Sequence, residues 1–184
     1  MDHVEITNMR AIIDRAKQGD GEAFSTLYQQ YVTPVYRYVY FRVRNQADAE
    51  DITQDVFIKT YQHLDRYSHQ EISLLAYLIT IARNTLTDHW RKKKTASLDE
   101  DWAMNIPDES TNLEKNISTR HDILHVQEKL KFLPDDQQEV ITMKFMNDLS
   151  NKEVAQVLGR TEESVRQLQS RGLKLLRELL NTYE

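Results

Sequence analysis

The side chains best suited to chemistry lie between Leu149 and Leu176. Arg166 and Gln167 carry the groups that pair most readily with guanine and adenine edges in the major groove of DNA. Arg160 and Thr161, just before them, could hold phosphate at a helix N-terminus. Further polar side chains would share the exposed start of this helix or lie behind it: Glu162, Glu163, Ser170, Arg171 and Lys174. The chemistry indicated is hydrogen bonding to duplex DNA.

Two capped helices would be needed to present these side chains. Ser150 with Glu153 is a capping-box pattern that opens a short helix, and Gly159 ends it. Thr161 then caps a longer helix that runs through Leu179. Apolar residues of both helices can pack together and fix their angle: Val154, Val157, Leu158, Val165 and Leu168. This pattern predicts a helix-turn-helix, with an ordinary antiparallel helix pair as the structural alternative.

A second set of polar residues lies on a helix expected over about residues 73–93. Spacings of three, four and seven place six side chains on one side of it: Tyr77, Thr80, Asn84, Thr87, Asp88 and Arg91. An aromatic ring, hydrogen-bonding groups and a basic end at residues 91–94 fit a nucleic-acid surface. The pattern is equally typical of an amphipathic helix with a solvated face.

A third set lies in the segment from Ala47 to Phe57, where acidic and amide side chains can share the outer side of a helix: Glu50, Asp51, Gln54 and Asp55. Acidic residues in a first turn also interact favourably with the helix dipole. From the residues alone, this structural interpretation is the better one.

Composition limits the fold and the class of function. The 184 residues include four glycines, three prolines and no cysteine, and the formal net charge is −5. These values favour a cytoplasmic all-α protein without disulfides, and no segment predicts a membrane span or a secretory signal. Because no glycine-rich phosphate loop is present and His121 and His125 lack a third ligand, we expect no enzyme, cofactor or metal site.

The segment over residues 95–120 is rich in Ser, Thr and Asn, and holds six acidic residues against Lys115 and Arg120, a net charge of −4. It is interpreted as a linker between two small helical domains, residues 1–94 and 121–184. Four helices are expected in the first domain: one over about residues 7–18, one that Asp20 caps and that Pro34 kinks or interrupts, one that Asp48 caps, and one over about residues 73–93. In the second domain we expect a helix over about residues 121–132, a helix opened by an Asp135–Gln138 capping box, and the two helices of the helix-turn-helix.

Four segments in this order resemble the compact sigma factors of the extracytoplasmic-function (ECF) group of the bacterial sigma-70 family: DGEAFSTLYQQYVTPVYRYVYFR, AEDITQDVF, LLAYLITIARNTLTDHWRKKK and LPDDQQEVITMKFMNDLSNKEVAQVLGRTEESV. The match covers about residues 20–94 and 132–179, which is most of the chain. The resemblance implies a protein that binds core RNA polymerase, recognises promoter DNA and promotes strand opening. It also implies an anti-sigma factor as a further partner.

The resemblance assigns a role to residues of each segment. The clamp helices of the largest polymerase subunit would be bound by Glu50, Asp51, Gln54, Asp55, Phe57 and Lys59. The minus-ten element would be read and opened by Tyr77, Asn84, Asp88, Arg91 and Lys92, with a flipped base held by the loop of about residues 65–71. The minus-thirty-five element would be bound by Arg160, Thr161, Glu162, Ser164, Arg166, Gln167, Ser170, Arg171 and Lys174.

Four positions depart from the family's usual residues. Tyr77 stands where the family usually has Trp, and Leu74 stands where it has Phe. Asp55 replaces the usual Glu, and Gly172 replaces the usual Ala. The glycine is expected to loosen the recognition helix by roughly 0.5–1 kcal/mol relative to alanine. Glu162 and Glu163 would repel phosphate, so we expect weak, salt-sensitive DNA binding by the free chain.

Two other functions remain as alternatives. A stand-alone helix-turn-helix regulator would explain residues 149–176, but it leaves residues 47–57 and the polar-striped helix without a role. An adaptor that binds only proteins is the second alternative.

Overall fold

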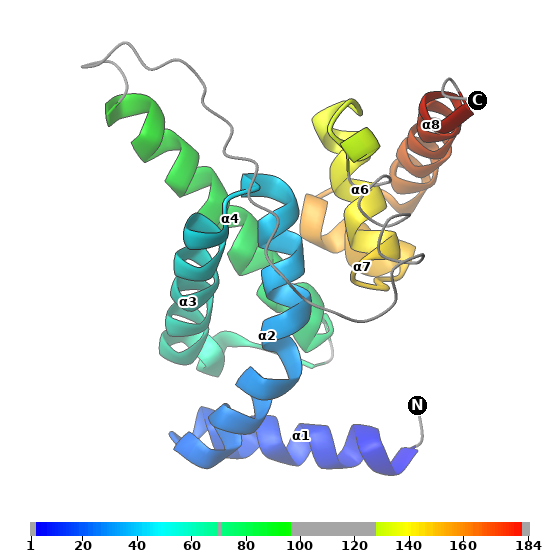
Figure 1. Cartoon of the computed structure of the whole chain (residues 1–184). Helices are drawn as coiled ribbons and strands as arrows, with labels where there is room; N and C mark the ends of the chain where they lie inside the picture. The colour runs from blue at the N-terminus through cyan, green and yellow to red at the C-terminus, as the bar shows by residue number, and fades with distance from the viewer. Residues whose placement is uncertain (1–2, 70, 97–127, 182–184) are drawn as a thin grey trace, which may run out of the picture. The chain divides into compact units, whose positions relative to one another are not determined.

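A computed structural model describes residues 3–69, 71–96 and 128–181. All regular secondary structure in these ranges is helical, so the predicted all-α class is confirmed. The chain divides into two compact units, Met1–Leu98 and Asp99–Glu184. The elements, shown in Figure 1, are α1 (His3–Lys17), α2 (Gly21–Val43), α3 (Gln46–His63), the 3₁₀ turn η1 (Leu64–Arg66), α4 (Leu74–Ala96), α6 (Asp135–Phe145), α7 (Asn151–Leu158) and α8 (Glu162–Asn181).

Unit 1 is built on α2, α3 and α4, which pack on one another, while α1 lies across the start of α2 (Figure 1). Apolar residues recur on one side of each helix and close a shared core. Its fully buried members include Val35, Tyr38, Val39, Val56, Leu78, Ile79 and Leu86. This packing holds the exposed sides of α3 and α4 in fixed positions.

The start of α2 follows the prediction, and of the two effects predicted for Pro34, a kink or an interruption, the interruption does not occur. Asp20 is the N-cap, and its side chain accepts hydrogen bonds from two backbone N–H groups of the first turn. Pro34 does not interrupt the helix, which continues from Gly21 to Val43. A proline removes one intrahelical hydrogen bond. Here Val35, directly after it, and Val39, one turn farther on, are fully buried, and this tertiary packing outweighs the local loss.

Two predicted caps are wrong by one to three residues. Asn45, not Asp48, caps α3, because its side chain accepts a hydrogen bond from the Asp48 N–H at 2.9 Å and so starts the helix one turn earlier. Pro134, not Asp135, precedes α6, and no side-chain cap bond forms there. Because the helix begins at Asp135, this residue is the first of the helix and not its cap, and the Gln138 amide donates to the Leu130 carbonyl.

Unit 2 contains the predicted helix-turn-helix. Ser150 and Glu153 form the capping box that opens α7, and Gly159 ends it in the left-handed region with φ of 63°. The Thr161 hydroxyl accepts a hydrogen bond from the Ser164 N–H at 3.2 Å, as predicted for the cap of α8. Val154, Val157 and Val165 are buried between α7 and α8, and Leu158 and Leu168 are half-buried.

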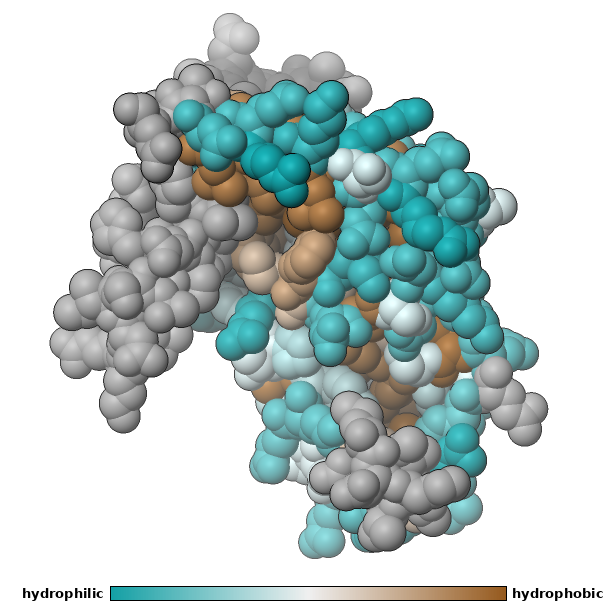
Figure 2. All heavy atoms as spheres, turned by 90° about the vertical axis from the view of Figure 1, so that its right-hand side faces the viewer, coloured by the Kyte–Doolittle hydropathy of each residue, from teal (hydrophilic) through white to brown (hydrophobic). Residues whose placement is uncertain are grey.

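The predicted linker and most of the helix predicted over residues 121–132 lie outside the described residues. Of that range residues 128–132 are described: 128–130 are helical, and 131 and 132 form a turn, so the helix ends before the predicted position. On the side of the chain seen in Figure 2, hydrophilic residues cover most of the described surface and hydrophobic residues show between them in patches.

Gly172 has a packing role that the sequence did not indicate. It is buried on α8, and a Cβ added there would lie 3.1 Å from Ile141 Cγ1 and 3.3 Å from Gln137 Cβ. The glycine therefore lets α8 approach α6 closely. Its effect on helix propensity is only part of its contribution to stability.

Candidate nucleic-acid and protein interfaces

The acidic strip on α3 is exposed as the spacing predicts. Buried residues of this helix, such as Ile52 and Val56, face the core. Four polar residues on the other side of the helix are all exposed: Glu50, Asp51, Gln54 and Asp55. Gln46 donates to a Glu50 carboxylate oxygen at 2.8 Å, one turn away. These four side chains form one surface with three carboxylates, which we call the acidic strip.

The two other residues assigned to this interface are placed differently. Phe57 is only 5% exposed, and its ring meets that of Tyr28 edge-on with the centroids 4.8 Å apart. The Lys59 ammonium donates to the Thr85 hydroxyl at 3.0 Å, so this side chain reaches toward α4. The structure therefore does not bring Phe57 and Lys59 onto the acidic strip.

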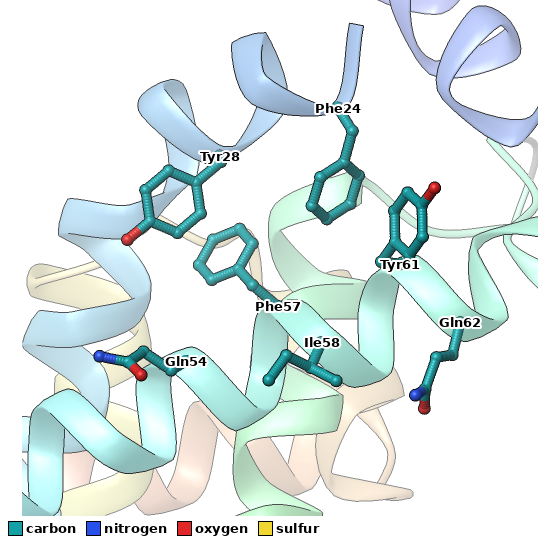
Figure 3. Close-up of a pocket in the computed structure, with 7 residues that line it drawn as sticks. All are labelled: Phe24, Tyr28, Gln54, Phe57, Ile58, Tyr61 and Gln62. Carbon is teal, nitrogen blue, oxygen red and sulfur yellow. The ribbon is translucent and has the colours of Figure 1, made fainter. Parts of the chain in front are cut away.

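An apolar groove runs beside the acidic strip between α2 and α3. Figure 3 shows the rings of Phe24 and Tyr28 approaching from α2, opposite those of Tyr61 and Phe57 on α3. The hollow measures about 470 Å³, and its remaining lining residues are Gln54, Ile58 and Gln62. Ile58 and Tyr61 are 55% and 52% exposed, although both are large and hydrophobic. These two side chains give the open side of the groove an apolar surface.

The sequence interpretation missed this groove. By helical spacing Tyr28 and Tyr61 belong to the apolar patterns of their helices, yet they are 39% and 52% exposed. The signal that could have revealed the groove is the position of Ile58. This residue lies seven after Asp51 and three after Asp55, and therefore on the exposed side of the same helix.

Six polar side chains follow one side of α4, and we call them the polar strip: Tyr77, Thr80, Asn84, Thr87, Asp88 and Arg91. Tyr77, half-buried, donates its hydroxyl proton to the His63 carbonyl at 3.1 Å, and burial raises its pKa. Asn84 is exposed, and farther along α4 the Arg91 guanidinium donates to Asp88 at 2.9 Å. Lys92 is also exposed. The five residues assigned to the minus-ten element thus follow one another from the start to the basic end of α4.

The recognition surface of α8 carries both bases and acids. Arg166 lies 3.4 Å from a Glu163 carboxylate oxygen, and Gln167 donates to the other oxygen of Glu163 at 3.4 Å. Arg160 donates to Asp136 of α6 at 2.5 Å. Three of the side chains assigned to DNA therefore contact carboxylates of the chain itself.

The other residues assigned to this surface are available to a partner. Thr161 and Glu162 are exposed at the start of α8, and Ser164 is half-buried. Ser170, Arg171 and Lys174 are exposed farther along the helix.

Some kinds of site are not found in the part of the chain that the structure describes. Among these residues there is no group of three or more His, Asp or Glu side chains that could hold a metal ion. No helix in the same residues is long and apolar enough to cross a membrane.

Comparison with known proteins bears on both units. Residues 27–96 match the Sigma-70 region 2 family, and residues 130–178 match the Sigma-70 region 4 family. The ECF RNA polymerase sigma factor BldN of Streptomyces coelicolor is 32% identical over 179 residues, which are 94% of this chain and 66% of BldN. The RNA polymerase sigma factor SigZ of Bacillus subtilis is 30% identical over 158 residues, which are 84% of this chain and 85% of SigZ. The chain belongs to the ECF group of the sigma-70 family.

Solved structures share the fold of this sigma factor. CnrH, in complex with the cytosolic domain of CnrY, is 21% identical with a TM-score of 0.72, and the match covers 95% of this chain and 98% of CnrH. The sigma factor RpoE of Bartonella quintana, in complex with the anti-sigma factor NepR, is 23% identical with a TM-score of 0.73, covering 88% of this chain and 98% of that one.

The family resemblance predicted from the four sequence segments is confirmed. Sigma factors are transcription initiation factors and not enzymes, which agrees with the expectation of a non-enzymatic chain. A stand-alone regulator would not account for the match to region 2, which covers the acidic strip and the polar strip.

Proposed function

We propose that unit 1 binds core RNA polymerase through the acidic strip and the apolar groove, and reads the minus-ten element through α4. The observation that carries this proposal is that the two strips lie on different helices packed around one core, so unit 1 can bind both partners at once. Unit 2 would bind the minus-thirty-five element as duplex, with the start of α8 in the major groove.

The acidic strip and the groove together fit an amphipathic helix. Glu50, Asp51 and Asp55 would pair with basic residues on such a helix. The groove beside them would accept one or two of its apolar side chains. The clamp helices of the polymerase largest subunit are the proposed partner, as the family resemblance implies.

The promoter surfaces would act only within the holoenzyme. Arg160, Arg166 and Gln167 already contact carboxylates, and those carboxylates repel phosphate. Opening the minus-ten element also requires unstacking of a base, which costs a few kcal/mol. Contacts made by the polymerase would supply the difference, so the free chain would bind promoter DNA weakly.

An inhibitory protein partner and a cytoplasmic location complete the proposal. The solved relative RpoE is bound to an anti-sigma factor, NepR. An anti-sigma factor that covers the groove and the acidic strip would block polymerase binding. Because the polymerase and its promoters are in the cytoplasm, the chain would work there.

The test is transcription by the purified chain with core polymerase that lacks its own sigma factor, on sheared genomic DNA with start-site mapping. We expect discrete starts that share two upstream sequence blocks. Asn84→Ala should relax the downstream block, and Arg166→Ala should relax the upstream block. Arg177→Ala, an exposed arginine farther along α8, is the matched control and should leave both blocks intact.

Polymerase binding is tested separately by co-elution. Asp55→Lys reverses one charge of the acidic strip and should abolish co-elution with core enzyme, while Arg177→Ala should not. If the wild-type chain neither co-elutes with core enzyme nor stimulates transcription, the proposed function is wrong.

A further inference from the structure

The loop between α3 and α4 is organised around the buried side chain of Tyr67, which is 3% exposed. Its hydroxyl donates to the Ile72 carbonyl at 3.0 Å, which ties the two ends of the loop together. The same oxygen lies 3.2 Å from His69 Nδ1, and the ring lies 5.2 Å from that of Tyr77 at the start of α4. Tyr67 therefore sets the shape of the loop and supports the first residue of the polar strip.

Tyr67 is held from outside the loop by Lys17, in the last turn of α1. The Lys17 ammonium donates to the Tyr67 backbone carbonyl at 2.5 Å and lies 5.6 Å from the centre of its ring. A hydrogen bond from a charged donor is stronger than a neutral one, and a buried carbonyl is costly to leave without a partner. This contact joins positions 50 apart in the sequence.

The contact gives α1 a structural role in the loop. This helix lies outside the region 2 match, which begins at residue 27, and it carries no residue of the acidic strip or the polar strip. If Lys17 releases the Tyr67 carbonyl, the loop loses a fixed point next to Tyr77. Tyr77 depends on the same segment, since its hydroxyl donates to the carbonyl of His63, just before η1. A change at Lys17 is thus transmitted through Tyr67 to a residue of the proposed minus-ten surface.

We propose that Lys17 is a positioning residue for promoter opening: it holds Tyr67 and the loop residues that contact it in the arrangement that accepts a flipped base, without itself touching DNA. The inference rests on the proposed function of that loop. It deepens this function by assigning α1 a part in recognition of the minus-ten strand.

The experiment uses holoenzyme reconstituted from the full chain and core polymerase, with a single-stranded minus-ten oligonucleotide from a mapped promoter as the probe. Lys17→Met keeps the aliphatic stem and removes the ammonium, while Lys17→Arg restores a charged donor. Gln18→Ala, at an exposed residue directly after α1, is the matched control. We expect Lys17→Met to weaken oligonucleotide binding about tenfold, as for the loss of one charge-assisted hydrogen bond. Lys17→Arg should recover most of this loss, and Gln18→Ala should have no effect.

A second measurement separates positioning from a general structural role. Each base of the oligonucleotide is replaced in turn by an abasic site. The loss caused by removing the flipped base should be much smaller in Lys17→Met than in the wild type, whereas losses at other positions should be equal in both. Unchanged binding by Lys17→Met, or equal losses in both proteins at every position, would overturn the inference while leaving the sigma-factor function intact. Failure of the wild-type chain to bind core enzyme would instead contradict the proposed function.

Discussion

Replacing Gly172 by alanine should destabilise unit 2, although the same change stabilises most helices. Alanine is favoured over glycine inside a helix by about 1 kcal/mol. At this position, however, the added methyl carbon would lie 3.1 Å from Ile141 Cγ1 and 3.3 Å from Gln137 Cβ. Carbon atoms prefer separations of roughly 3.5–4.0 Å. Either Ile141 or the helix that carries it must therefore move by a few tenths of an ångström.

Ile141 has little room to move, because it is 2% exposed and its neighbours Val140 and Met143 are completely buried. Forcing an extra carbon into a packed core costs about 1–3 kcal/mol. This cost exceeds the propensity gain, and we expect a net loss of about 1 kcal/mol in the free energy of unfolding of unit 2. For a domain of this size, such a loss lowers the unfolding midpoint by roughly 4–8 °C.

The assay is hydrogen exchange of the full chain, read separately for peptides from α6 and α8. Gly21→Ala is the matched control, because a Cβ there would meet nothing within 4 Å, and it should not speed exchange in unit 1. Ile141→Val removes the Cδ1 atom that would lie 3.4 Å from the new methyl group. The double variant should therefore lose less stability than the sum of the two single variants. If helix propensity alone decided the outcome, alanine would stabilise α8 by about 1 kcal/mol, which corresponds to about fivefold slower exchange. Slower exchange of this size in α8 of Gly172→Ala would refute the close-approach argument.

Three further predictions concern the surfaces and the loop. Asp136→Asn removes the carboxylate that Arg160 contacts, so Arg160 should become available to bind phosphate. One additional phosphate contact should steepen the plot of log binding constant against log salt concentration by roughly 0.9 for minus-thirty-five binding by the holoenzyme. Equal slopes for the variant and the wild type would contradict this. Burial lowers the pKa of His69 from its ordinary 6.5, so below that pH the unfolded chain takes up a proton that the folded chain resists. Unit 1 should therefore lose stability as the pH falls through 6.5, and His69→Gln should flatten this loss in melting curves; parallel curves would show that His69 is not the cause. Ser150→Ala breaks the capping box with Glu153 and should cost about 1 kcal/mol, seen as faster hydrogen exchange in α7 with α8 less affected.

Most helices could be predicted from the sequence because their signals are local. The capping box at Ser150 and the glycine at 159 are set by residues within one turn, and both are present in the structure. The wrong caps at Asp48 and Asp135 lie where several good capping residues compete within a few positions. The continuity of α2 through Pro34 could not be predicted locally, because the burial of neighbouring residues is a tertiary effect that the local pattern does not contain.

The candidate site could be predicted only in part, for the same reason. Periodicity placed Glu50, Asp51 and Asn84 on exposed faces, and all three are exposed. It could not reveal that Lys59 reaches Thr85, because such a contact joins two helices. The link from Lys17 to Tyr67 spans 50 positions and has no local signature at all.

The carboxylate of Glu163 has a consequence for how selective the recognition helix is. It contacts both Arg166 and Gln167, the two side chains of α8 that we propose read base edges. A promoter must therefore offer these donors better acceptors than the ones they give up. An unrelated sequence gains little from the exchange and leaves the donors with Glu163. The internal acid thus acts as a competitor: any sequence that takes the two donors loses affinity by the free energy of the contacts they give up.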